Sequence, residues 1–177
     1  MIKSSWRFAM VTFVIFLLIL NPGTHPAMAT TEWYFNVDSF EDFNDFVPNS
    51  VCSIGQVIDG PCTLRAAIAE ANAIIDTYNI VIDLPAGNYE LAIPSENSND
   101  ITSGDLNILG SDGLHSITLR CTDPQPAVID ARLLDRVLRI EPGAKVTLEN
   151  IVVRGGLLSW TGSIDMLDGA GILNEGT

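Results

Sequence analysis

Basic residues are scarce in this sequence. Among its 177 residues, 9 are Lys or Arg and 22 are Asp or Glu, so the formal net charge is -13. Nucleic-acid binding needs a basic patch, and docking on an anionic membrane surface also needs positive charge. The charge balance therefore argues against both partners. The hydrophobic share of 47% is too high for a disordered chain, so we expect one folded domain.

Motifs that carry chemistry are equally few. The sequence has no nucleophile motif, no phosphate-binding loop and no metal-ligand spacing. Its two histidines are His25 and His115, and its three cysteines form no CxxC pair, which disfavours a cysteine metal site. Four nearby acids could bind calcium but lack the EF-hand pattern, so a solvated acidic face is the preferred interpretation. These acids are Asp38, Glu41, Asp42 and Asp45. We expect no metal and no cofactor.

A long apolar run is also missing. Residues 8–20 are apolar except for Thr12, which falls short of the roughly 20 residues that a membrane span needs. Lys3 and Arg7 precede the run, and Ala27-Met28-Ala29 follows it as a small-residue cleavage site. Residues 1–29 are therefore predicted to be a signal peptide, cleaved between Ala29 and Thr30. An uncleaved anchor is the alternative. Either way the chain is expected to be secreted or held at the cell surface.

The cysteines suggest one disulfide. Cys52 and Cys62 are close in sequence, and the glycines and the proline between them allow a loop to close. Disulfides persist outside the cytoplasm, so we predict that these two pair; three free buried thiols are the alternative. Cys121 follows an apolar strand pattern and is expected to be a buried thiol that behaves as a small hydrophobic residue.

One helix is predicted, over residues 63–76. Apolar Leu64, Ile68, Ala71 and Ile75 recur at helical spacing, and five alanines favour this conformation. Thr63 can serve as the N-cap. Arg65 and Glu70 within this helix are expected to meet solvent or a neighbouring loop. Before the helix, the phenylalanines at 40, 43 and 46 are spaced as on a short helical turn, although aromatic packing under a cap is preferred.

After the helix the sequence consists of short apolar runs separated by turns. The repeated unit reads as a strand, a glycine turn and another strand, with turn glycines at Gly87, Gly113, Gly143 and Gly176. Repeats of this length indicate a solenoid with loop insertions. Both a β-sandwich and a parallel β-helix remain open. Asn150 lies where a sharp bend would separate two strands, and asparagine tolerates the left-handed conformation of such a bend.

The helix start resembles a known family. The run Cys62-Thr63-Leu64-Arg65-Ala66-Ala67-Ile68 is similar to the CSLREA-type motif near the N-terminus of secreted bacterial proteins. Residues 136–151 and 169–177 resemble β-helix rungs of those proteins, a rung being one turn of the coil. The likeness runs from about residue 33 to the end. It departs at Ala66, where an acidic residue is usual.

The resemblance implies an all-β fold, a right-handed parallel β-helix of pectin-lyase-like shape with few rungs and an N-terminal capping helix. Residues 30–79 then form the cap, and residues 80–177 form the rungs, incomplete at the C-terminal side. Family members are mostly secreted or surface proteins of unassigned activity, for which adhesion or carbohydrate contact is supposed. We expect a non-enzymatic protein of this kind, acting in adhesion, as a scaffold or in carbohydrate contact. A further hypothesis is that the chain is the N-terminal piece of a longer protein.

The alternative function is a polysaccharide lyase or glycoside hydrolase of pectin-lyase-like fold. Such enzymes use clustered acidic and basic side chains on one outer face, where paired carboxylates can act as acid and base. The candidates are Asp130, Arg132, Asp135, Arg136, Arg139 and Arg154. Charge pairs between rungs are the preferred interpretation. The expected partners are a polysaccharide, another cell-surface protein, or a second copy that pairs with the open edge of the last rung.

Overall fold

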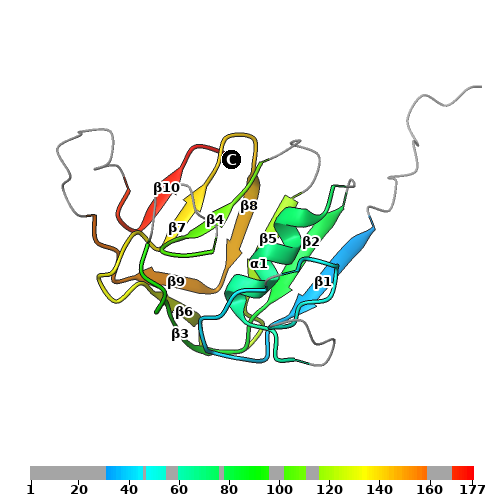
Figure 1. Cartoon of the computed structure of the whole chain (residues 1–177), viewed down its shortest axis with the longest axis horizontal. Helices are drawn as coiled ribbons and strands as arrows, with labels where there is room; N and C mark the ends of the chain where they lie inside the picture. The colour runs from blue at the N-terminus through cyan, green and yellow to red at the C-terminus, as the bar shows by residue number, and fades with distance from the viewer. Residues whose placement is uncertain are drawn as a thin grey trace, which may run out of the picture.

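The computed structural model describes residues 31–45, 47–54, 60–75, 78–95, 102–110, 116–158 and 169–177. These residues form mostly strands in three parallel sheets, with one α-helix (Figure 1). The predicted signal peptide and its cleavage site lie outside the described residues, as do both histidines and Gly113. None of the helical structure within the described ranges is long and apolar enough to cross a membrane.

The elements alternate between sheets rather than forming hairpins. The helix and strands are β1 (Glu32–Asn36), α1 (Leu64–Ala73), β2 (Asn79–Asp83), β3 (Gly87–Glu90), β4 (Leu106–Ile108), β5 (Ser116–Arg120), β6 (Ala127–Asp130), β7 (Leu138–Ile140), β8 (Lys145–Glu149), β9 (Ile151–Arg154) and β10 (Ile172–Asn174). One sheet has the order β1-β2-β5-β8, the second β4-β7-β10 and the third β3-β6-β9. Every strand pair between these elements is parallel.

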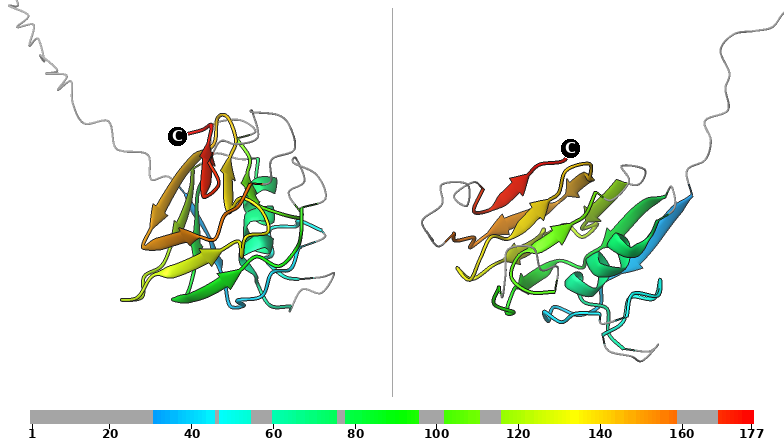
Figure 2. Two further views of the ribbon diagram at one scale, coloured as in Figure 1. Left: turned by 90° about the vertical axis from the view of Figure 1, so that its left-hand side faces the viewer. Right: turned by 45° about the horizontal axis from the view of Figure 1, so that its top comes forward.

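The chain visits the three sheets in the same sequence three times. We call each visit a circuit: β2, β3 and β4 form the first, β5, β6 and β7 the second, and β8, β9 and β10 the third. Each strand pairs with its counterpart in the next circuit, and Figure 2 shows the strands following one another in this order. Strand β1 lies beside β2, so residues predicted as part of the cap also extend a sheet.

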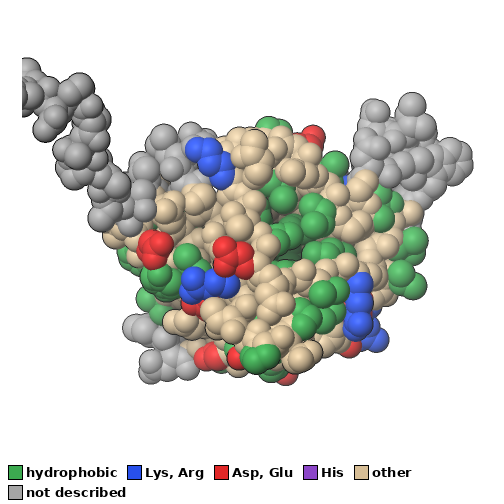
Figure 3. All heavy atoms as spheres, turned by 180° about the vertical axis from the view of Figure 1, so that it is seen from behind, with side chains coloured by type: hydrophobic (Ala, Val, Ile, Leu, Met, Phe, Trp, Pro, Cys, Tyr) green, Lys and Arg blue, Asp and Glu red, His purple; other side chains and the backbone are tan. Residues whose placement is uncertain are grey.

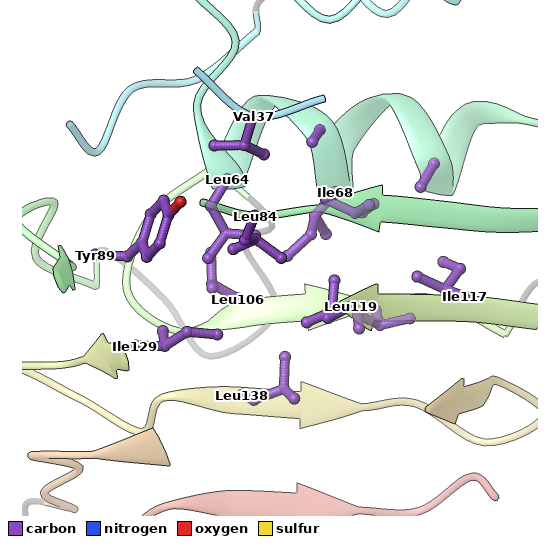
Figure 4. Close-up of a cluster of buried hydrophobic side chains, with 14 of the residues drawn as sticks. Val37, Leu64, Ile68, Leu84, Tyr89, Leu106, Ile117, Leu119, Ile129 and Leu138 are labelled. Carbon is purple, nitrogen blue, oxygen red and sulfur yellow. The ribbon is translucent and has the colours of Figure 1, made fainter. Parts of the chain in front are cut away.

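The core lies between the three sheets. Alternate residues of each strand point inward, because successive side chains of a strand face opposite sides. In the largest sheet Ile80 and Ile117 are register partners, as are Ile82 and Leu119, and all four are at most 1% exposed. Figure 4 shows side chains of α1 and of the strands converging on this cluster. Like residues therefore stack on like residues from one circuit to the next.

Helix α1 begins where the sequence predicts and ends earlier. The Thr63 hydroxyl accepts a hydrogen bond from the amide of Ala66 at 3.1 Å, which confirms the predicted N-cap. The helix stops at Ala73 rather than at residue 76, because Ile74 already has an extended conformation. Ile75, predicted on the buried face, is 80% exposed. The helix packs on β2 and β4, strands of the first circuit.

The predicted two-strand repeat is wrong, since each circuit has three strands. Gly143 (φ 86°) turns the chain between β7 and β8, as expected. Gly87, however, is the first residue of β3 and lies at a different corner. A side chain there would collide with the Phe40 ring, which packs on Tyr89 with ring centroids 5.0 Å apart. Gly87 is therefore required by this close approach and does not mark the repeat.

Residues 40–45 form no helical turn. Phe40 and Phe43 are about half exposed, at 47% and 49%, although Phe40 contacts Tyr89. The preferred interpretation of aromatic packing under a cap thus holds for one face of Phe40 only. Phe46 lies outside the described residues.

The cysteines behave as the sequence predicts. Cys52 and Cys62 form a disulfide with their Cα atoms 5.1 Å apart. Cys121 is a free thiol, 4% exposed, at the corner after β5. Its sulfur donates to the carbonyl of Gln125 at 3.3 Å.

Asn150 makes the corner between β8 and β9. It has φ 55°, the left-handed conformation expected for it. Its side-chain amide donates to three carbonyls of the corner below, those of Cys121, Asp123 and Gln125, at 3.3, 2.9 and 3.3 Å. The one residue thus turns the chain and joins two successive circuits.

Two substitutions at this corner separate its roles. Asn150→Ala removes the amide donor and also puts alanine, which tolerates the left-handed conformation less well than asparagine, at φ 55°. We therefore expect the free energy of unfolding to fall by about 2–3 kcal/mol. Asn150→Gly removes the donor but tolerates the conformation, and should lose about 1–2 kcal/mol. Urea titration followed by circular dichroism measures both. Equal losses would mean that backbone strain is not involved.

Candidate functional site

The residues of the CSLREA-like motif lie at the start of α1, next to the loop of residues 38–43. Thr63 accepts from Ala66, and its hydroxyl also donates to the carbonyl of Phe43 at 2.6 Å. The amide of Cys62 donates to Asp38 at 2.7 Å. Leu64, Ala66, Ala67 and Ile68 are all buried. This stretch therefore ties the loop of residues 38–43 to the start of the helix.

Arg65 forms a buried clamp at the centre of this region. Its Nε and Nη2 atoms donate to the two carboxylate oxygens of Asp42, at 2.6 and 3.1 Å, and the two side chains are 1% and 3% exposed. The guanidinium also donates to the carbonyl of Gly104 at 2.8 Å and to that of Asp105 at 3.3 Å. Arg65 therefore meets neighbouring loops and not solvent, one of the two environments predicted for it.

Asp42 extends this clamp to a further segment. One of its oxygens also accepts from the amides of Ala92 and Ile93, at 2.8 and 3.1 Å, just after β3. The clamp thus joins α1, the cap loop and the connection between β3 and β4. Each nitrogen of the Arg65 guanidinium and each carboxylate oxygen of Asp42 therefore has a hydrogen-bond partner. Removing one member of such a buried ion pair lowers the stability of the fold strongly, because the other charge is left unpaired.

A pair of carboxyl groups is buried on the other side of α1. Glu70 is fully buried and accepts hydrogen bonds from the amides of Asn49 and Ser50, the shortest at 2.6 Å. Burial raises its pKa above the usual range, and the Asp45 carboxyl beside it raises it further. Asp45 accepts from Val47 through one oxygen, and its other oxygen has no partner among the described residues.

Replacing Glu70 with glutamine should stabilise the protein near neutral pH. A raised folded-state pKa means that the contribution of Glu70 to stability is fully present below its unfolded pKa and is lost as pH rises through the folded value. Glutamine does not ionise, can accept from both backbone amides and can donate to Asp45. We expect a gain of about 1 kcal/mol at pH 7–8 that shrinks as the pH falls toward 4.

Thermal and urea unfolding between pH 4 and pH 8 test this prediction. Glu90→Gln is the matched control, because Glu90 is 47% exposed on its side chain and pairs with Arg132 at the surface. It should show no comparable gain at high pH. A Glu70→Gln protein that is less stable than the parent at every pH would mean that the charged hydrogen bonds outweigh the cost of burial.

The six candidate catalytic residues fall into separate groups. Asp130 and Arg154 are register partners on β6 and β9 and form an ion pair of 2.8 Å. Arg132 pairs with Glu90 at 2.9 Å, and its amide donates to Asp130. That amide bond, followed by Arg154, lowers the pKa of Asp130 below its usual range. Asp130 is thus held as a carboxylate, which makes it a poor proton donor at neutral pH.

The other three candidates lie near the second sheet. Arg136 pairs with the buried Asp105 at 3.2 Å and donates to the carbonyl of Gly169 at 2.9 Å. Burial raises the pKa of Asp105, and the charge of Asp135 adds to this. Arg139 pairs with Glu141 at 3.0 Å and with Glu175 at 3.2 Å. Asp135 accepts from the amide of Arg136 at 2.7 Å.

These contacts favour the interpretation of the charged set as pairs between circuits. Four of these ion pairs join successive circuits: Asp130–Arg154, Glu90–Arg132, Asp105–Arg136 and Arg139–Glu175. The pair of Arg120 with Asp83, at 2.8 and 3.0 Å, does the same, whereas Arg139 and Glu141 belong to one circuit. Figure 3 shows acidic and basic side chains as neighbours on the face opposite the view of Figure 1. What this arrangement can do is hold strands in register.

No family model, no curated protein and no solved structure matches the chain. The function must therefore be argued from the site alone. The resemblance to the CSLREA-type proteins stays a prediction.

The described residues contain no group of three or more His, Cys, Asp or Glu side chains that could hold a metal ion. Of the four acids considered for calcium, three are committed to the protein: Asp38 to the Cys62 amide, Asp42 to Arg65 and Asp45 to the Val47 amide. The fourth, Glu41, is exposed. The expected solvated acidic face is therefore right for Asp38 and Glu41, which are exposed, and wrong for Asp42 and Asp45, whose side chains are buried.

Proposed function

We propose that this chain is a right-handed parallel β-helix capped by α1 and acting as a non-enzymatic binding or scaffold module. The observation that supports the coil is that the chain visits three parallel sheets in one repeated order. Connections between parallel strands of one sheet are right-handed in about 98% of cases, which supports the handedness. Each circuit would then be one rung.

We propose that the protein acts outside the cytoplasm. The Cys52–Cys62 disulfide supports this, since such bonds persist in oxidising compartments. The layout of residues 1–29 is consistent with it. The module would be secreted or held at the cell surface, as in the proteins that the motif resembles.

We propose a non-enzymatic function from one observation: each of the six charged residues considered for catalysis takes part in an ion pair or a backbone hydrogen bond. Asp130 bonds Arg154 and Arg132, and Arg136 bonds Asp105. A protein that holds its charges in this way is suited to present a rigid surface. The net charge of -13 disfavours polyanions, so the proposed ligands are neutral glycans or proteins.

The test has a binding arm and a turnover arm. The purified chain is applied to an array of neutral and acidic glycans, and is separately incubated with neutral and acidic polysaccharides, with and without calcium. We expect saturable binding to neutral glycans and no new chain ends or unsaturated products. Cleavage that disappears in Asp130→Ala or Arg132→Ala would instead establish a lyase or hydrolase and overturn the proposal.

A further inference from the structure

Two acidic side chains are buried side by side between the cap and α1. Glu70 is 0% exposed and Asp45 is 6% exposed. The two carboxyl groups lie within hydrogen-bond range of each other, and neither forms an ion pair among the described residues. Taking two negative charges out of water without a cation is very costly. The pair therefore needs a partner that reduces its charge.

The charged groups around α1 do not supply that partner. The helix packs on β2, on β4 and, through its N-cap, on the cap loop. Charged residues on or beside these elements are paired with other groups; the pairs are Asp42–Arg65, Asp83–Arg120 and Asp105–Arg136. Asp38 and Glu41 of the cap loop are exposed. Asp45 is thus the charged group that acts on Glu70.

One atom of the acid pair lacks a donor. Asp45 Oδ1 accepts from the amide of Val47 at 2.9 Å, whereas Oδ2 is buried and has no donor among the described residues. Glu70 accepts from the amides of Asn49 and Ser50, at 2.9 and 2.6 Å. A proton on Glu70 turns one of its oxygens into the donor that Asp45 Oδ2 lacks. The same proton leaves one buried negative charge in place of two.

We propose that Glu70 and Asp45 share one proton and that this acid pair is a pH-sensitive latch between the cap and α1. With the proton present, Glu70 donates to Asp45 and the latch is closed. As the pH rises the proton passes to water and the two carboxylates repel each other. Asp45 then turns out toward solvent, because Glu70 is fixed on the helix and held by two backbone amides.

The direction of the pKa of Glu70 agrees with a retained proton. Burial raises this pKa and the hydrogen bond with Asp45 raises it further, against the lowering effect of the backbone amides. A group with a raised folded-state pKa contributes stability below its unfolded pKa, and this contribution is lost as pH rises through the folded value. The latch is therefore closed in acid and opens at higher pH.

Opening of the latch changes the surface of the cap. Phe43 and Val47 lie on either side of Asp45 in the chain and are 49% and 46% exposed. The carbonyl of Phe43 also accepts from the hydroxyl of Thr63, the N-cap of α1. Movement of Asp45 therefore rearranges two exposed apolar side chains and the contact of the cap with the helix. The cap presents different surfaces in acid and at neutral pH.

NMR titration of the side-chain carboxyl carbons tests the shared proton. Between pH 3 and pH 9 the pair should titrate in two steps, the upper at least about one pH unit above 4.3, the ordinary value for glutamate. Asp45→Asn should lower the midpoint of Glu70, because the like charge is gone and the asparagine amide donates to the carboxylate. Ordinary midpoints for both carboxyls would overturn the proposal, as would a titration that shifts on addition of calcium, which would put a cation in place of the proton.

Exchange of the Val47 amide with water, measured by NMR, tests the opening, because this amide bonds Asp45. The rate in the parent protein is divided by the rate in Glu70→Gln at the same pH, which cancels the intrinsic pH dependence of exchange. Glutamine keeps a donor to Asp45 at every pH, so the ratio should be near one at pH 4 and at least about tenfold at pH 8. The amides of Asn49 and Ser50 bond Glu70 itself, so their ratio should not rise.

Glu90→Gln is the matched control, because Glu90 is a surface carboxylate paired with an arginine. The parent and this variant should exchange the Val47 amide at the same rate at both pH values. Asp45→Asn is the second variant that cannot open by ionisation, and it replaces Glu70→Gln if that protein does not fold. A Val47 ratio that is the same at pH 4 and pH 8 would overturn the latch, as would an equal rise with Glu90→Gln or a rise at all three amides. Neither measurement involves a glycan, so the latch and the proposed function are tested separately.

Discussion

Replacing Arg65 with alanine should lower the free energy of unfolding by about 3–5 kcal/mol, the largest single effect expected in this chain. The change leaves the Asp42 carboxylate in a site where it is 3% exposed, with no cation beside it. It also removes the donors to the carbonyls of Gly104 and Asp105. Urea unfolding monitored by tryptophan fluorescence and by circular dichroism measures the loss.

Arg132→Ala is the matched control for Arg65→Ala. Arg132 also forms an arginine–carboxylate pair, but the side chains of that pair are 59% and 47% exposed, so its loss should cost less than about 1 kcal/mol. Adding Asp42→Asn to the Arg65→Ala protein should recover part of the stability, because the buried charge is then gone. Similar small losses for both arginines would show that the clamp is not buried in solution.

Removing the Cys52–Cys62 disulfide should cost about 3 kcal/mol. The two residues are separated by 10 positions, and closure of a loop of this length in the unfolded chain accounts for an effect of that size. The loss should fall on the cap, because Cys62 adjoins Thr63, the N-cap of α1. The Cys52→Ala, Cys62→Ala double variant is compared with the parent by thermal unfolding.

The reductant dependence separates the disulfide from the thiol. A reducing agent should lower the thermal unfolding midpoint of the parent protein toward that of the double variant. It should leave the unfolding midpoint of the double variant unchanged. Cys121 is a thiol in both proteins and cannot produce a difference between them. A parent whose midpoint does not respond to a reductant that cleaves the bond, as shown by thiol labelling, would refute the prediction.

Local features of the sequence predicted local features of the structure. The Thr63 cap, the Asn150 bend and the Cys52–Cys62 pair all depend on residues near one another in the chain, and each is present. The predicted end of α1, at residue 76, was wrong because the apolar spacing in the sequence continues to Ile75. Nothing in that spacing shows that the chain must turn out of the helix to begin β2 at Asn79.

The three strands of each circuit were not predicted, because the repeat was defined by the spacing of turn glycines. Asn150 marks the corner between β8 and β9, but no asparagine lies between β2 and β3 or between β5 and β6, so the same corner was not recognised in the earlier circuits. Gly87 serves a ring contact and not the repeat. The parallel β-rich architecture could thus be predicted from short apolar runs, whereas the number of strands per circuit could not.

The charge pairs depend on register, which the sequence does not display. Asp130 and Arg154 are separated by 24 residues and Glu90 and Arg132 by 42, so no helical or hairpin spacing links them. The Asp42–Arg65 pair spans 23 residues. Asp42 was predicted to be a solvated acid because the acids near it, Asp38, Glu41 and Asp45, form no calcium-binding pattern, and burial by the folded cap is a tertiary effect.

The repeated order in which the chain visits its sheets has a consequence for how the protein forms in time. Each circuit pairs only with the one before and the one after it, and β1, the disulfide and α1 come first along the chain. A growing chain can therefore complete its cap and use it as a template, adding one layer whenever another three strands emerge. Pausing during synthesis would leave a shorter stack, already folded, in place of a misassembled intermediate.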